Sequence, residues 1–207
     1  KIFSLAKENK INFLDTAKNY GESEKLLGKK NLKNWNVVSK LPSLPPLIED
    51  ISNWIESQVL DSLKSLKIKT LYGYLIHSPE QLLSNVGDEI WRALLKQKKR
   101  GLIRKIGYSI YNPKQLDKLF PEFRPDIVQS PYSILDRRLK KSGWLKKLKD
   151  KNIEIHIRSI FLQGLLLLEK RKRGKKFEKW NNVFESWDNW IIANKLNKIE
   201  ACLSFVF

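Results

Sequence analysis

The sequence contains no methionine among its 207 residues. Because translation starts at methionine, we expect the chain to be a processed product or a piece of a longer protein. Cysteine is almost absent as well, since Cys202 is the sole cysteine and no disulfide can form within the chain. A lone cysteine is typical of a reducing compartment, so the cytoplasm is the expected location.

Long apolar runs are also missing. The longest one, "IFLQGLLLL" at residues 160–168, is interrupted by Gln163 and Gly164. A membrane-spanning helix needs about 18 apolar residues or more, so no span is predicted. The first ten residues mix charged and apolar positions and do not resemble a secretory signal. The glycine-rich phosphate turn G-x-G-x-x-G of dinucleotide-binding open sheets does not occur either.

Acidic residues are few relative to basic ones: 40 lysines and arginines face 22 acids, which gives a formal net charge of +18. Such a charge suits either a polyanion-binding surface or a lysine-rich composition spread along the chain. The basic residues fall mostly on predicted helix faces without interleaved aromatic residues, which favours the second interpretation and no nucleic-acid partner. The densest cluster, residues 169–179, is a candidate anion contact or a solvated face.

A hydrophobic fraction of 42% is typical of a globular protein. Short apolar runs with strand character alternate with segments of helical periodicity, which predicts repeated βα units and a parallel sheet in one domain, residues 1–207. Both an open doubly wound sheet and a (β/α)8 barrel have this pattern. The expected strands are residues 11–14, 36–39, 71–76, 103–108, 126–129 and 153–157, and the expected helices include 48–66, 88–99, 142–151 and 186–207.

Every predicted strand has a polar residue at or near its carboxyl end. In parallel α/β folds ligands bind at this edge of the sheet, and in barrels essentially always. The sequence therefore predicts a functional site there, formed by Asp15, Lys40, His77, Ser109, Gln129 and Arg158.

Four residues near these ends, Asp15, Tyr20, Lys40 and His77, make chemical sense together. A lysine ammonium near a tyrosine favours the phenolate and lowers the tyrosine pKa, and a carboxylate keeps that lysine charged. A neutral imidazole can hydrogen-bond a substrate oxygen. Such a group suits carbonyl reduction, in which Tyr20 protonates the oxygen.

Each of the four also has an ordinary explanation. Asp15 could cap a helix, Tyr20 could be packed in the core, Lys40 could extend from a strand end to solvent, and His77 could be a loop histidine. The other histidine, His156, lies in the alternating stretch "IEIHIR", where no partner is evident, and we expect it to be structural.

The stretches "FLDTAKNYGESEKLLG", "VVSKLP", "YLIHSPE", "IRKIGYSIYNPKQLDKL", "DIVQSPYSILDRR" and "IRSIFLQGLLL" follow one another through nearly the whole chain. In order and spacing they resemble the aldo-keto reductases, which are NAD(P)H-dependent (β/α)8 TIM-barrel enzymes. The resemblance implies that this chain is an oxidoreductase that reduces an aldehyde or ketone to an alcohol. It also implies NADPH, or alternatively NADH, as cofactor, a small carbonyl substrate and no metal.

The same resemblance implies individual roles. Tyr20 is the proton donor, Lys40 and Asp15 tune its pKa, and His77 orients the carbonyl. Ser109 and Gln129 bind the nicotinamide carboxamide. Two positions depart from the family pattern: Ile110 replaces the usual asparagine, and Arg158 replaces a tyrosine that stacks on the nicotinamide in many members. Arg158 is thus expected to contact the cofactor, by stacking or through a phosphate.

The family barrel has eight strands, whereas six are predicted here. We therefore expect an incomplete barrel without its first and eighth strands, truncated at both ends, that is poorly soluble or oligomeric and binds NADPH weakly. Two other functions stay open. One is a catalytically silent barrel that binds nucleotide or a protein partner, and the other is polyanion binding carried by charge alone.

Overall fold

The computed structural model describes residues 2–207. Its centre is one parallel sheet whose strands lie side by side in the order of the sequence, β1 to β6. This confirms the predicted sheet and all of its predicted strands to within two residues at each end. The strands are β1 (Phe13–Asp15), β2 (Asn36–Leu41), β3 (Leu71–Ile76), β4 (Ile103–Ser109), β5 (Ile127–Pro131) and β6 (Glu154–Arg158).

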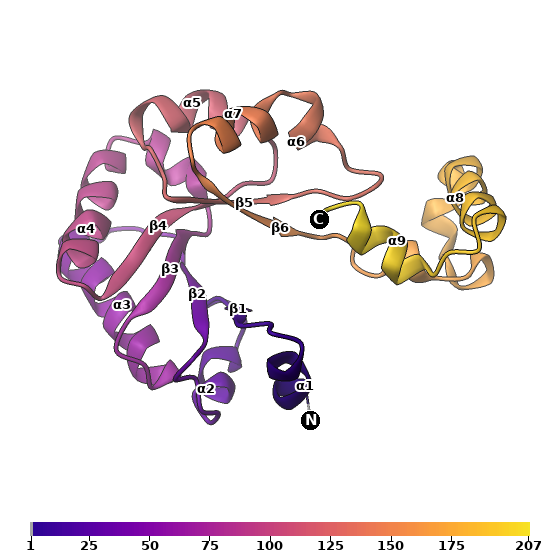
Figure 1. Cartoon of the computed structure of the whole chain (residues 1–207). Coiled ribbons are helices and arrows are strands. Elements are labelled where there is room, and N and C mark those ends of the chain that lie inside the picture. Colours follow the sequence, from indigo (N-terminus) through magenta and orange to yellow (C-terminus); the bar gives the residue numbers. More distant parts are fainter. Residues whose placement is uncertain (1) are drawn as a thin grey trace.

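Helices connect successive strands and cover the outer side of the curled sheet (Figure 1). The α-helices are α1 (Ile2–Glu8), α2 (Ser23–Leu27), α3 (Ile51–Leu66), α4 (Gly87–Lys99), α5 (Gln115–Glu122), α6 (Arg138–Lys141), α7 (Trp144–Asp150), α8 (Asn181–Ala193) and α9 (Lys198–Ser204). Short 3-10 helices lie between them: η1 (Pro79–Leu83), η2 (Leu165–Leu167), η3 (Lys170–Lys172) and η4 (Lys175–Trp180).

The main core lies between the outer helices and the sheet. Helix α3 shows why it forms, because its apolar residues recur at helical spacing and turn one stripe toward the strands. Ile55, Val59 and Leu66 of this stripe are completely buried. The helix begins where the Asp50 side chain accepts a hydrogen bond from the Asn53 amide and ends at Lys67, which has a left-handed conformation.

The sheet curls as the wall of a barrel does, but it stays open among the described residues. Strand β1 pairs with β2 alone, and β6 pairs with β5 alone. Figure 1 shows the open side between α1 and the arm formed by α8 and α9. The prediction of an incomplete barrel is therefore confirmed, and the concave face of the sheet is accessible from one side.

The predicted last helix, residues 186–207, is wrong as a single element. The structure has two helices, α8 and α9, with a turn between them. Lys195 adopts a left-handed conformation with φ of 52°, which ends the first helix. The Asn197 side chain then accepts a hydrogen bond from the Ile199 amide and starts the second. The apolar spacing predicted the helical faces but not this break.

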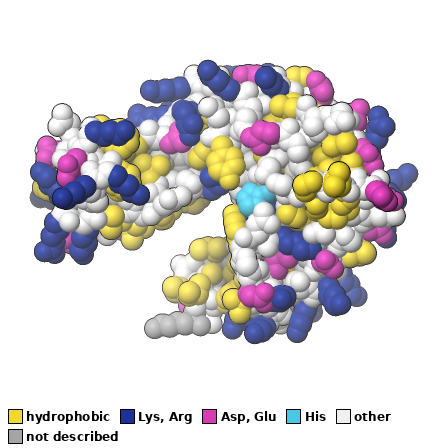
Figure 2. All heavy atoms as spheres, turned by 180° about the vertical axis from the view of Figure 1, so that it is seen from behind, with side chains coloured by type: hydrophobic (Ala, Val, Ile, Leu, Met, Phe, Trp, Pro, Cys, Tyr) yellow, Lys and Arg dark blue, Asp and Glu magenta, His cyan; other side chains and the backbone are white. Residues whose placement is uncertain are grey.

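Basic side chains are distributed over the whole visible face rather than gathered in one patch (Figure 2). In the densest basic cluster, residues 169–179, several charges are engaged within the chain. The Arg173 side chain is only 4% exposed and pairs with Asp188, and Lys170 pairs with Glu185. Part of this cluster therefore fixes the loop to α8. Within residues 2–207, the structure has no helix of sufficient length and apolar character to cross a bilayer.

Candidate active site

The polar residues predicted at the strand ends do meet at one edge of the sheet. Asp15 and Ser109 are the last residues of β1 and β4, and Lys40 is the last but one of β2. His77 follows β3 directly, Gln129 is the middle residue of β5, and Arg158 ends β6. Parallel pairing in sequence order brings these ends together, because neighbouring strands point the same way.

Lys40 and Asp15 form the centre of this group. The Lys40 ammonium is 1% exposed and donates to both carboxylate oxygens of Asp15, at 2.9 and 2.8 Å, and to the carbonyl oxygen of Thr16 at 2.8 Å. All three of its N–H donors therefore have acceptors. Burial lowers the pKa of Lys40, and the Asp15 charge opposes that shift. The carboxylate thus compensates the buried charge, as the sequence predicted.

Tyr20 lies in the turn after β1, directly before Gly21. Gly21 has a φ of 57°, a left-handed conformation that glycine adopts without the steric cost that a side chain would add. The Lys40 ammonium lies 5.1 Å from the centre of the Tyr20 ring. The His77 ring lies 5.9 Å away, centre to centre, and is nearly perpendicular to it at 82°. Tyr20 is 48% exposed, so a substrate can reach it from the open side. The four predicted catalytic residues are therefore neighbours.

The prediction that Lys40 lowers the pKa of Tyr20 is wrong, because the structure raises this pKa. Burial and the negative charge of Asp15 raise the pKa of Tyr20, and the Arg158 charge only partly opposes them. The Asp15 carboxylate pairs with Lys40 at 2.8 Å, so its negative charge lies at the same place as the ammonium and opposes a lowering of the Tyr20 pKa. Tyr20 is accordingly a protonated phenol at neutral pH.

His77 is partly buried and stays neutral. Burial lowers the pKa of its imidazole, and the positive charges of Lys40 and Arg158 lower it further. Its Nδ1 atom is buried without a hydrogen-bond partner among the described residues. An unpaired buried nitrogen beside an exposed phenol indicates a position where a ligand or water supplies the missing contact.

Ser109 and Gln129 extend the polar chain toward the middle of the sheet. The Ser109 hydroxyl donates to the Gln129 side-chain oxygen at 3.1 Å, and the Gln129 amide donates to Asp15 at 2.8 Å. Both side chains are almost fully buried, at 2% and 3% exposure. The pair is therefore held in a fixed orientation by the same carboxylate that holds Lys40.

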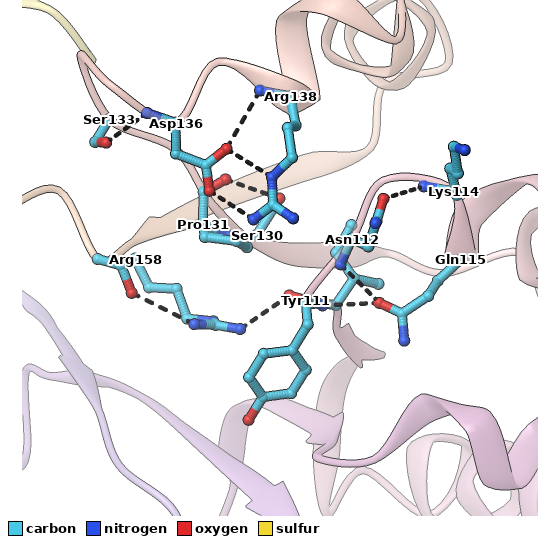
Figure 3. Close-up of polar contacts among 12 residues, drawn as sticks. Tyr111, Asn112, Lys114, Gln115, Ser130, Pro131, Ser133, Asp136, Arg138 and Arg158 are labelled. Atoms are coloured by element: carbon cyan, nitrogen blue, oxygen red, sulfur yellow. Dashed lines mark hydrogen bonds and ion pairs between the residues drawn. The ribbon is translucent and has the colours of Figure 1, made fainter. Parts of the chain in front are cut away.

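Arg158 is positioned by residues that follow β4. Its guanidinium donates to the Ile110 carbonyl oxygen at 3.0 Å and lies 4.4 Å from the centre of the Tyr111 ring (Figure 3). Tyr111, which is 56% exposed, was not among the predicted site residues. An aromatic residue directly after a strand end is the signal that could have identified it.

His156 has a partner, contrary to the sequence-based expectation. Its Nε2 atom lies 2.6 Å from Oε1 of Glu154. The other carboxylate oxygen of Glu154, Oε2, accepts a hydrogen bond from Tyr72 at 2.8 Å and pairs with Lys105. These residues come from β3, β4 and β6 and form a second polar cluster on the concave face of the sheet. Its partners all belong to the sheet, which agrees with the predicted structural role of His156.

Comparisons with known proteins agree with the fold and the order of these segments. The family model described as "Aldo/keto reductase family" matches residues 1–207. A chloroplastic pyridoxal reductase from Arabidopsis thaliana is 34% identical over 135 residues, which are 58% of this chain and 36% of that protein. The chain thus spans about a third of the length of that relative.

Solved structures are similar over most of the chain. A glycerol dehydrogenase from Gluconobacter oxydans has a TM-score of 0.77 and 23% identity, with 99% of this chain and 71% of that chain covered. The holo form of an aldo-keto reductase from Bacillus halodurans has a TM-score of 0.67 and 25% identity, with 84% and 59% covered. The six strands therefore correspond to part of a barrel of this kind.

Proposed function

Because this chain belongs to the aldo/keto reductase family, we propose that it is an oxidoreductase that reduces a small aldehyde or ketone to an alcohol with NADPH, or alternatively NADH. One observation carries the proposal: Tyr20 lies beside the Lys40–Asp15 pair and opposite His77 at the carboxyl edge of the sheet. An acid and a neutral hydrogen-bonding group then lie side by side, with a charged pair next to the acid.

Tyr20 is the proposed proton donor. A general acid must carry its proton at the working pH, and the raised pKa of Tyr20 ensures this at neutral pH. As the carbonyl oxygen gains negative charge, the nearby Lys40 ammonium stabilises the phenolate that forms. The raised pKa also makes Tyr20 a weaker acid at rest, so transfer depends on this charge development.

His77 is proposed to hold the carbonyl oxygen in place. As a neutral imidazole it has one N–H donor, which can bond a carbonyl oxygen without competing for the Tyr20 proton. Its perpendicular contact with the Tyr20 ring fixes where that oxygen lies relative to the phenol. Lys40 and Asp15 then act on Tyr20 through charge and position.

The buried Ser109–Gln129 pair suits a nicotinamide carboxamide, which needs one donor and one acceptor. Gln129 uses one N–H toward Asp15 and one lone pair toward Ser109, so an N–H and a lone pair remain. When bound, the cofactor supplies the hydride to the carbonyl carbon. Arg158 is the third cofactor contact that the family resemblance implies, but Tyr111 already covers one face of its guanidinium, which leaves the edge donors for another ligand.

One observation favours a second function, a catalytically silent barrel that binds nucleotide or a protein partner. Ser109, Gln129 and Asp15 already hydrogen-bond one another, and Ile110 contributes its carbonyl to Arg158 rather than a polar side chain to a ligand. A site with these contacts could bind a nucleotide without turnover.

The substitution Tyr20→Phe separates the two functions. It removes the phenolic proton while keeping the ring against His77, so we expect a loss of about a hundredfold to ten-thousandfold in carbonyl-dependent NADPH oxidation, with unchanged NADPH affinity. Pyridoxal belongs in the substrate panel because the Arabidopsis relative is a pyridoxal reductase. Tyr108→Phe, the same loss of a hydroxyl from a tyrosine buried in the main core, is the control. Turnover by Tyr20→Phe at the wild-type rate would contradict the role of Tyr20, and no wild-type turnover would favour the silent barrel.

A further inference from the structure

Arg158 is a site residue whose charge has no acidic partner. Among residues 2–207 it takes part in no ion pair, whereas nearby Arg138 is held by two hydrogen bonds to Asp136 (Figure 3). Arg158 is partly buried at the end of β6 and lines a pocket of about 420 Å³ along this strand, together with Asp15, Gln129 and Glu154. A partly buried cation in a pocket is costly unless something compensates it.

The guanidinium is held firmly but is far from saturated. It stacks on the Tyr111 ring and donates to the Ile110 carbonyl oxygen and, at 3.4 Å, to the Ser159 hydroxyl. An arginine has five N–H donors in a rigid fork, and these two bonds leave three without a partner among the described residues. A fork with a fixed plane and free edge donors matches the two oxygens of a carboxylate.

The net charge of the site also favours an anionic ligand. Asp15 neutralises Lys40, His77 is neutral, and Tyr20 is protonated, so Arg158 leaves the group with one net positive charge. Its charge acts on Tyr20, Lys40 and His77 alike, which places it within electrostatic reach of all three. An anion bound to Arg158 would therefore lie next to the reacting groups.

We propose that Arg158 binds a carboxylate of the substrate, so that the substrates are carbonyl compounds with a carboxylate group on the same small molecule. The inference rests on the proposed function, which supplies the carbonyl and its reduction. Arg158 would fix the charged end of the substrate, while Tyr20 and His77 receive the carbonyl end. Tyr111 acts as a positioning residue that keeps the guanidinium in its plane.

Binding of two inert probes tests the carboxylate site separately from turnover. Benzoate and benzamide have the same shape and differ in charge, so calorimetric titration of the chain with each isolates the contribution of the anion. We expect benzoate to bind at least tenfold more tightly, and Arg158→Gln to abolish the difference. Arg104→Gln is the control, because Arg104 is exposed at the opposite end of β4 and its loss changes the net charge equally.

Arg158→Lys distinguishes the contribution of the paired guanidinium donors from that of the positive charge. It keeps a cation but loses the paired donors, so we expect an intermediate preference for benzoate. Circular dichroism of each variant shows whether it is folded, and should Arg158→Gln fail to fold, Arg158→Lys and Tyr111→Leu carry the test. Equal binding of benzoate and benzamide to the wild type would overturn the proposal. An equal loss of preference in Arg104→Gln would overturn it as well.

Turnover gives a second and independent readout. We expect kcat/KM for 4-carboxybenzaldehyde to exceed that for benzaldehyde about tenfold or more, through KM, and Arg158→Gln to remove this ratio. Reduction of both aldehydes at equal efficiency would overturn the inference while the proposed function stands. Benzoate selectivity without any reduction would overturn the proposed function alone. If Arg158→Gln weakens NADPH binding and leaves the benzoate preference intact, Arg158 serves the cofactor and the proposal is wrong.

Discussion

At the scale of single residues, the site depends on which groups are charged. Burial and the Asp15 charge keep Tyr20 protonated, whereas burial and the positive charges of Lys40 and Arg158 keep His77 neutral. The proximity of the four residues was predictable from the sequence because each lies at or after the end of one of three neighbouring parallel strands. The direction of the Tyr20 pKa shift was not predictable, because it depends on how deeply the phenol is buried and on how close it lies to Asp15.

The pH dependence of reduction follows from these two shifts. Tyr20 must be protonated to donate, and its pKa is raised above the usual value of about 10, so kcat/KM should stay flat from neutral pH to about pH 10 and fall above it. His77 must be neutral, and its pKa is lowered below about 6.5, so an acid limb should appear only below that value. Steady-state rates with a neutral aldehyde between pH 5 and 11 measure both limbs.

Circular dichroism across the same range is the control for loss of fold. An alkaline limb with a midpoint near pH 7 to 8 would contradict the raised pKa. It would show instead that Lys40 keeps enough free charge to acidify the phenol, as the sequence alone had suggested.

The Lys40–Asp15 pair also makes a stability prediction. Asp15→Asn leaves an ammonium that is 1% exposed without its counter-charge, so we expect a loss of about 2 kcal/mol in the free energy of unfolding. Lys40→Met removes the buried charge itself and leaves a carboxylate that is 43% exposed and can be hydrated, so its cost should be smaller. Urea denaturation of both variants measures the two costs, and a larger loss for Lys40→Met would show that the pair is not a compensated buried cation.

At the scale of elements, the strands were predictable and their cross-sheet contacts were not. Short apolar runs between helical segments predict strands wherever both faces of a sheet are covered. The cluster around Glu154 combines residues of β3, β4 and β6, and β6 is not a neighbour of β3 or β4 in the sheet. Such a contact depends on the curl of the sheet, which no local pattern encodes. The break at Lys195 was missed for a similar reason, because a left-handed lysine has no strong sequence signature.

This Glu154 cluster should contribute to stability. Glu154→Leu removes the acceptor shared by Tyr72, Lys105 and His156, and these donors are only partly hydrated. We expect a loss of about 2 kcal/mol, and a smaller one for Glu154→Gln, which keeps an acceptor oxygen. Thermal and urea unfolding measure both variants, with Glu178→Leu in η4 as a control outside the cluster. Equal costs for Glu154→Leu and Glu178→Leu would contradict the prediction.

The stabilisation by the Glu154 cluster should decrease at low pH. Burial opposes the shift, but hydrogen bonds from Lys105, His156 and Tyr72 lower the pKa of Glu154. A lowered folded-state pKa means that the stabilisation is present above the unfolded-state value of about 4.3 and is lost as the pH falls through the folded-state value. The difference between wild type and Glu154→Leu should therefore shrink below about pH 4.

At the scale of the whole molecule, two opposing properties decide whether the chain associates. The sheet has open edges at β1 and β6, and Phe13 on β1 is 42% exposed. Unpaired strand edges are templates for pairing with another chain. Against this, a net charge of +18 is spread over the surface and repels other copies. Salt screens the repulsion between copies but leaves hydrogen bonding between strand edges intact, so the extent of association should depend on ionic strength.

We therefore expect the chain to sediment as a species larger than its monomer mass of 24.4 kDa, with more association at 0.5 M than at 0.05 M salt. Phe13→Lys places a charge at a partly exposed position of the edge strand β1 and should reduce association. Leu47→Lys adds the same charge at a fully exposed loop residue away from the edges and should change it little. Sedimentation velocity on the three proteins makes the comparison, with thermal unfolding to confirm that Phe13→Lys is folded. A monomer at every salt concentration, or equal effects of the two lysines, would show that the edges of this sheet are not its sites of association.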